Sequence, residues 1–124
     1  MNLHTELLDH ITARFGERLQ GAPQLTQDAL ALSLDNGVQL TIRYAATDAY
    51  SLRWTCQAVG KSVEMGIDTA PTHPTLATRP NHLHLADGRA VADPLTRTDA
   101  SPADNLSALI EALLRDPQLD FPQP

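Results

Sequence analysis

Four runs of residues between positions 29 and 68 alternate apolar and polar side chains with a period of two. This is the spacing of a strand with one buried face. The dipeptide Asn36-Gly37 separates the first two runs, and it favours a tight hairpin turn because such turns need positive φ at both central residues. The pattern predicts consecutive antiparallel strands near residues 29–34, 38–44, 50–56 and 62–68.

The segment after the fourth run is punctuated by proline. Pro71, Pro74 and Pro80 remove backbone donors that a sheet would need, so residues 69–80 are predicted to form an ordered loop. Residues 81–85 alternate again and predict a fifth strand. After a turn, residues 89–92 can return beside it as a short edge strand.

Apolar residues recur at steps of three and four over residues 3–19, which predicts an N-terminal helix. We expect His4 and His10 of this helix to face solvent. A second such stripe follows Ser101, which can cap a helix, and Pro102, which suits the first helical position. The two stripes are expected to bury Leu7, Ile11, Phe15, Leu106, Ile110 and Leu113.

Together these elements predict an α+β fold: an antiparallel meander of about five strands with the N- and C-terminal helices packed on one face. The chain has 124 residues, the size of one ordinary domain. We therefore expect residues 1–116 to form a single α+β domain and residues 117–124 to form a tail. The second sheet face would be left open to solvent or to a partner.

The composition limits what such an open face can do. Fifteen acidic and nine basic residues give a net charge of −6, which excludes a uniformly basic surface for nucleic acid but allows a local basic site. The single cysteine, Cys56, excludes an internal disulfide and a multi-cysteine zinc site. No apolar run is long enough to cross a membrane, and no signal peptide is visible. We expect a cytoplasmic protein.

Alternation also predicts which side chains the open face carries, because residues two apart on a strand point the same way. If the apolar residues face the helices, the opposite face carries two arginines, two histidines and acidic residues: Arg43, Arg53, Glu64, Asp68, His82 and His84. One extra residue in a strand, such as a bulge near Gly66 or Pro80, would place the arginines and histidines on opposite faces.

The pair His82 and His84 is the clearest chemical signal in the sequence. On a strand, two such side chains are close enough to share a ligand, and we expect both to be exposed. Their spacing suits hydrogen bonding to the adjacent loop, acid–base catalysis or nucleic-acid contact, and metal binding. The spacing alone leaves these three roles open.

Two residues of the proline-punctuated segment extend the candidate site. His73 either takes part in the chemistry or fixes the loop. Arg79 leads into the strand of the histidines and can bind a phosphate or a carboxylate such as Asp68 or Asp87.

Arg43 and Arg53 form the basic part of the predicted face. They lie on neighbouring strands and point the same way, so an anion is needed between or beside them. That anion is either a protein carboxylate, from Glu64 or Asp68, or a bound phosphate.

The segment from Asp68 to His84 resembles the small bacterial TumE-like proteins, which are toxins of toxin–antitoxin modules. Their pattern is an Asp, an Ala-Pro-His-His-Pro stretch and a Phe-Pro-His-His-x-His stretch, followed by a C-terminal helix. Thr72 and Asn81 stand where the family often has histidine, and Arg79 replaces an aromatic residue. The matching residues are Asp68, Pro71, His73, Pro74, Pro80, His82 and His84.

The resemblance implies a toxin or a toxin-derived protein that has a cognate antitoxin as its partner and RNA as its target. In an RNA-cleaving version, one histidine deprotonates the 2′-hydroxyl and another protonates the leaving oxygen. This chemistry requires no metal ion and no cofactor. The catalytic residues would be Asp68, His73, His82 and His84, and the substrate-binding residues would be Arg43, Arg53 and Arg79.

An alternative is a non-enzymatic adaptor or secretion-chaperone-like module that binds an unfolded segment at its sheet or sheet edge. Small size, acidic charge and the order helix, meander, helix also suit that function. The histidines separate the two interpretations, because a chaperone does not need them. A homodimer is compatible with either.

Overall fold

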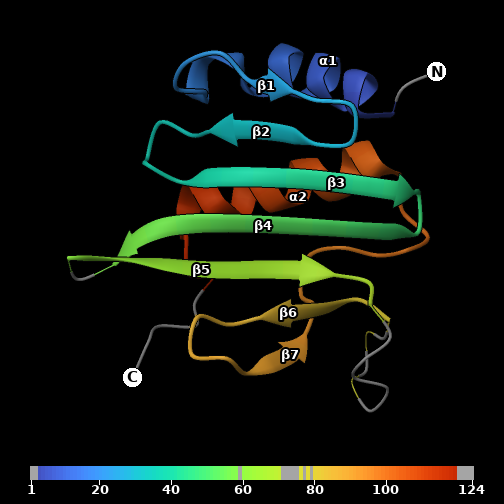
Figure 1. Cartoon of the computed structure of the whole chain (residues 1–124), viewed down its shortest axis with the longest axis vertical. Coiled ribbons are helices and arrows are strands. Elements are labelled where there is room, and N and C mark those ends of the chain that lie inside the picture. Colours follow the sequence, from blue (N-terminus) through green and yellow to red (C-terminus); the bar gives the residue numbers. More distant parts are fainter. Residues whose placement is uncertain (1–2, 59, 71–75, 77, 79, 120–124) are drawn as a thin grey trace.

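Every strand pairs with its neighbour in sequence, so the sheet is a simple antiparallel meander. The computed structural model describes residues 3–58, 60–70, 76, 78 and 80–119, and Figure 1 shows the arrangement of its elements. The seven strands are β1 (Gln24–Leu25), β2 (Leu30–Ser33), β3 (Gln39–Ala46), β4 (Ala49–Ala58), β5 (Lys61–Asp68), β6 (His82–His84) and β7 (Ala90–Ala92).

Both helices lie behind the same face of this sheet (Figure 1). They are α1 (Leu3–Phe15), which continues into a short 3₁₀ turn, and α2 (Pro102–Arg115). The predicted cap of α2 is confirmed, since the backbone N–H of Asp104 donates to Ser101 Oγ at 3.1 Å. His10 and Ser107 hydrogen bond between the helices at 2.9 Å. Neither helix of the described chain is long and apolar enough to span a membrane.

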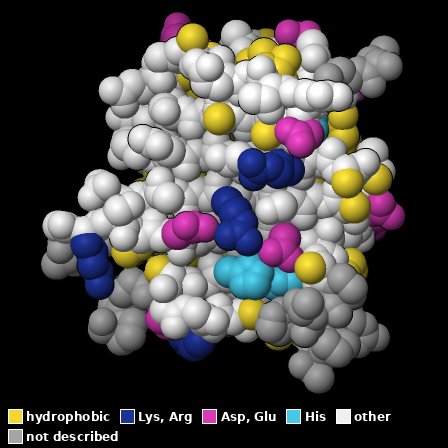
Figure 2. All heavy atoms as spheres, in the orientation of Figure 1, with side chains coloured by type: hydrophobic (Ala, Val, Ile, Leu, Met, Phe, Trp, Pro, Cys, Tyr) yellow, Lys and Arg dark blue, Asp and Glu magenta, His cyan; other side chains and the backbone are white. Residues whose placement is uncertain are grey.

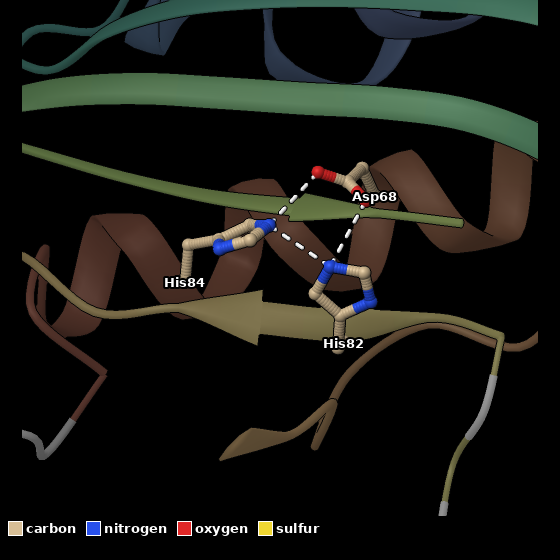
Figure 3. Close-up of side chains that lie close together, drawn as sticks. All are labelled: Asp68, His82 and His84. Carbon is tan, nitrogen blue, oxygen red and sulfur yellow. Dashed lines mark hydrogen bonds and ion pairs between the residues drawn. The ribbon is translucent and has the colours of Figure 1, made fainter. Parts of the chain in front are cut away.

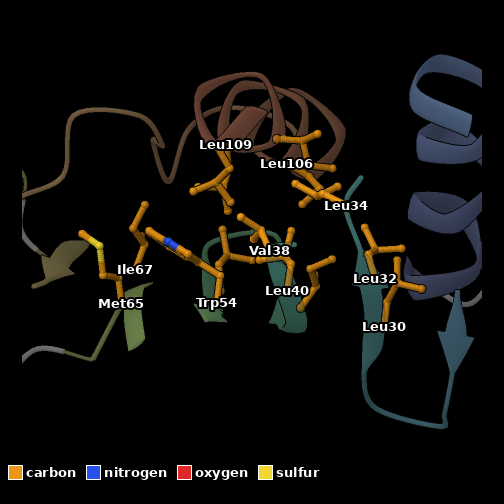
Figure 4. Close-up of a cluster of buried hydrophobic side chains, with 14 of the residues drawn as sticks. Leu30, Leu32, Leu34, Val38, Leu40, Trp54, Met65, Ile67, Leu106 and Leu109 are labelled. Carbon is orange, nitrogen blue, oxygen red and sulfur yellow. The ribbon is translucent and has the colours of Figure 1, made fainter. Parts of the chain in front are cut away.

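The core lies between the helices and the sheet (Figure 4). Trp54 is 1% exposed, and its indole N–H donates to the Pro117 carbonyl at 3.0 Å. Cys56 is buried beside it, and burial raises the pKa of its thiol. All six residues expected from the helical stripes are buried: Leu7, Ile11, Phe15, Leu106, Ile110 and Leu113.

The predicted α+β class and the packing of both helices on one face are therefore confirmed. The sheet has more strands than the five or so expected, because the two-residue β1 is too short to show alternation. The strand β7 is the short edge strand considered for residues 89–92, and it pairs with β6.

The bulge occurs in a different place from the two considered in the sequence. The register shifts between Tyr44 and Ala46, whereas pairing from β4 through β5 to β6 is unbroken at Gly66. His4 is buried beside this irregularity, contrary to expectation, because its Nε2 accepts a hydrogen bond from the Tyr44 N–H at 3.1 Å.

Candidate functional site

The strand pairing aligns two rows of residues across the open face. Directly paired residues point to the same side of a sheet. The first row is Arg43, Ser51, Asp68 and His82, and the second row is Thr41, Arg53, Gly66 and His84. The arginines and histidines thus share one face, as alternation predicts. Figure 2 shows basic, acidic and histidine side chains meeting in the middle of this face.

Three of these side chains form a compact group, which we call the histidine–aspartate cluster: Asp68, His82 and His84 (Figure 3). Asp68 ends β5, and the two histidines come from the neighbouring strand β6. The Nε2 atoms of the histidines lie 2.9 Å apart. Asp68 Oδ1 lies 3.1 Å from His82 Nε2, and Asp68 Oδ2 lies 2.9 Å from His84 Nε2. The two imidazoles and the carboxylate therefore converge on one point.

The two histidines differ in exposure, which the alternation did not predict. The side chain of His84 is 40% exposed and that of Asp68 is 17% exposed, but that of His82 is only 1% exposed. The His82 ring packs edge-on against the His84 ring, with ring centres 4.5 Å apart. Its Nδ1 lies 3.0 Å from the Pro80 carbonyl oxygen. These contacts cover His82 on a face that is otherwise open.

The Pro80 carbonyl determines which nitrogen of His82 carries the proton. A carbonyl oxygen only accepts hydrogen bonds, so His82 Nδ1 is the donor and is protonated. In the neutral ring, His82 Nε2 then presents its lone pair to Asp68 and His84. The sequence gives no signal for such a backbone contact, because the direction of a carbonyl is set by the local chain path.

The two arginines on the same face as this cluster differ in their ion pairing. Arg53 donates to Glu64 at 3.0 Å, and both side chains are 58% exposed. Arg43 is exposed and has no ion-pair partner among the described residues. Of the two anions considered, Glu64 therefore pairs with Arg53, whereas Asp68 contacts the histidines. The arginines line a shallow hollow of about 250 Å³ with residues of β3, β4 and β5: Gln39, Thr41, Trp54, Thr55 and Glu64.

Gly66 lies between Arg53 and His84 in the second row and has no side chain of its own. These residues occupy successive positions of one row, and a Cβ on Gly66 would lie 3.3 Å from Arg53 Cγ and 3.2 Å from the Leu52 carbonyl oxygen. The stem of Arg53 therefore lies over the glycine. Sequence reasoning considered Gly66 only as a bulge, although a lone glycine inside a strand also indicates a close approach.

Two predicted site residues, His73 and Arg79, lie outside the described residues. Of the carboxylates considered for Arg79, Asp68 belongs to the cluster, and Asp87 accepts a hydrogen bond from Arg89 Nε at 2.7 Å.

The sequence of the chain matches a known protein family. A family model described as Toxin TumE matches residues 9–118, which is most of the chain. The chain belongs to the TumE toxin family. The resemblance inferred from the segment Asp68–His84 is thereby confirmed, and the match extends from within α1 through the seven described strands and α2. No curated protein and no solved structure matches the chain.

Asn81, which the resemblance compares with a histidine, does not belong to the cluster. Its side chain is 4% exposed and donates to Asp93 Oδ2 at 2.8 Å and to the Thr96 carbonyl at 2.9 Å. These bonds fix the segment that follows β7. The Asn81 side chain therefore has structural contacts of its own, and neither of these hydrogen bonds is made to Asp68, His82 or His84.

Proposed function

We propose that this TumE-family toxin cleaves RNA and that His84 acts as the general base. The observation that carries the proposal is that His84 is the most exposed residue of the histidine–aspartate cluster and is held by its two other members. In the neutral ring, His84 Nε2 faces a carboxylate and the lone pair of His82, so Nε2 is protonated and Nδ1 accepts the proton. A carboxylate orients the base of hydrolytic triads in the same way.

Arg53 and Arg43 supply the binding site for the phosphate in this proposal. The shallow hollow that they line lies next to the cluster on the same face, since Arg53 pairs with Gly66 and Gly66 pairs with His84. A phosphate bound by the guanidinium of Arg53 would lie between this arginine and His84, which are the neighbours of Gly66 in one row across the sheet. Guanidinium groups suit this role, because they bind two phosphate oxygens at once and stabilise the charge that develops during transfer.

The general acid in the proposal is a second histidine. His82 is buried and already donates from Nδ1, so the better candidate is His73 of the TumE motif, with Arg79 as a further phosphate ligand. A toxin of this kind also requires an antitoxin. We therefore propose a cognate antitoxin as the partner and the cytoplasm as the site of action.

The proposed chemistry is tested with oligonucleotides. The purified chain should cleave a single-stranded RNA and leave a 2′,3′-cyclic phosphate, because the 2′-hydroxyl is the nucleophile. The same sequence with 2′-deoxyribose throughout should remain intact. Mass spectrometry of the products distinguishes these ends. Cleavage of the deoxyribose strand at a similar rate, or no cleavage of any RNA together with normal growth on expression, would refute the proposal.

We expect Arg53→Gln to reduce kcat/KM for RNA by about 10- to 100-fold, the effect of removing a hydrogen bond between charged groups. Arg18→Gln is a matched control, because Arg18 also forms an exposed ion pair, with Asp35, but lies away from the cluster. Initial rates over a range of RNA concentrations measure both variants. Equal losses in the two variants would indicate a general effect of charge and would remove Arg53 from the site.

A further inference from the structure

We propose that the histidine–aspartate cluster binds one divalent first-row transition-metal ion and that this ion inhibits the toxin. The binding is argued from the cluster itself. The inhibition rests on the proposed function, in which His84 is the general base. The argument begins with the three close contacts among Asp68, His82 and His84.

No distribution of protons turns all three contacts into hydrogen bonds while Asp68 is ionised. An ionised carboxylate only accepts, so both histidine Nε2 atoms would have to donate to it. Two protonated nitrogens would then face each other at 2.9 Å. If either nitrogen is unprotonated, its lone pair faces the carboxylate instead. A cation at the centre removes the conflict, because each of the three groups can direct a lone pair at it.

The distance between the two histidine nitrogens fits neighbouring positions on an octahedral ion. Ligand atoms about 2.0–2.2 Å from a metal lie about 2.8–3.1 Å apart at neighbouring octahedral positions, and about 3.3–3.6 Å apart in a tetrahedron. The two histidine Nε2 atoms lie 2.9 Å apart, and each lies close to a different oxygen of Asp68: His84 Nε2 to Oδ2 at 2.9 Å, and His82 Nε2 to Oδ1 at 3.1 Å. Two histidines and one carboxylate on a face of the octahedron form a known ligand set for first-row metals and leave the remaining positions for water.

The surroundings of the ligands also suit a metal. Metal-binding histidines usually donate their other ring nitrogen to a carbonyl or carboxylate, which fixes the ring with its lone pair toward the ion. His82 Nδ1 makes this contact with the Pro80 carbonyl. Asp68 Oδ1 also accepts from the Ala70 N–H at 3.1 Å, which holds the carboxylate in place. His82 is enclosed and His84 is partly exposed, so the open side of His84 offers an entry path.

Metal binding would change the proton position on His84. A neutral imidazole that binds a metal through Nε2 keeps its single proton on Nδ1. The nitrogen that accepts the proton of the 2′-hydroxyl in the free toxin then becomes a donor. The ion thereby removes the general base without moving the side chain, and cleavage stops until the metal dissociates.

Binding is measured on the full chain without RNA. Co²⁺ is titrated and followed by its visible absorption, and Zn²⁺ is titrated by calorimetry. We expect one ion per chain in both titrations. Asp68→Asn preserves the size of the side chain, and both Asp68→Asn and His84→Ala should weaken binding by at least about tenfold. His10→Ala, a matched loss of one histidine from α1, should bind as the original chain does. Circular dichroism establishes which variants are folded.

The inhibition is measured as the RNA cleavage rate against Zn²⁺ concentration, with a protein-free reaction as the blank. The rate should fall with the midpoint found by calorimetry and should recover when a chelator is added. Absence of a one-to-one site, or binding that survives in folded Asp68→Asn, would overturn the metal proposal. Binding without inhibition would overturn the regulation alone. A chain that binds metal but cleaves no RNA under any condition would instead refute the proposed function.

Discussion

Replacing His84 by alanine is expected to reduce the rate of RNA cleavage by about 10²–10⁴-fold, the usual contribution of a positioned general base. Nothing else in the histidine–aspartate cluster can replace it. His82 is 1% exposed, and Asp68 is oriented toward the two rings. Single-turnover kinetics with a short RNA measure this loss directly, because they separate the chemical step from product release.

The fold should survive this substitution. The His84 side chain is 40% exposed, and replacements at such positions usually change stability by less than about 0.5 kcal/mol, special contacts aside. His10→Ala is the control, since it removes a histidine from the opposite side of the sheet. If folded His84→Ala cleaves RNA at the original rate, the base lies elsewhere. A loss of activity that parallels a loss of thermal stability would assign His84 a structural role.

Replacing Leu109 by alanine is expected to lower the free energy of unfolding by about 2–5 kcal/mol. Leu109 is fully buried, and it extends from α2 toward the sheet (Figure 4). Its truncation removes apolar contacts and leaves a cavity that the surrounding strands fill only in part. The free energy is obtained from urea denaturation followed by circular dichroism.

Leu25→Ala is the matched control for this substitution. Leu25 is 40% exposed on the edge strand β1, so the same change of side chain should cost less than about 0.5 kcal/mol. Similar costs at both positions would show that α2 is not packed on the sheet as described.

Much of this fold could be predicted because its main elements have strong periodic signals. The strands β2 to β5 alternate clearly, and α2 carries both an apolar stripe and the Ser101 cap. The strand β1 has two residues, too few for a period to be recognised. The burial of His4 depends on a tertiary contact with the backbone of Tyr44, and a local pattern carries no information about such a contact.

For the candidate site, the sequence allowed one prediction: which residues lie on the same face of the sheet. Alternation places Arg43, Arg53, His82 and His84 together because register is preserved through Gly66. It does not fix side-chain rotamers, so the convergence of the two histidines on Asp68 required the structure. The burial of His82 could not be predicted from the sequence either, because it depends on contacts with the Pro80 carbonyl and the His84 ring.

The cluster lies near one end of the sheet, so a ligand bound to it should stabilise the strands at that end. The strand β6 is joined to β5 through three residue pairs and to β7 through three more, whereas β4 and β5 share eight. Local opening therefore costs less free energy here than in the centre of the sheet. A ligand that joins Asp68 to the two histidines ties β5 to β6, and its binding free energy is added to the cost of that opening. Any ligand held by all three side chains should therefore slow amide hydrogen exchange in β6 and β7 without changing exchange in β3.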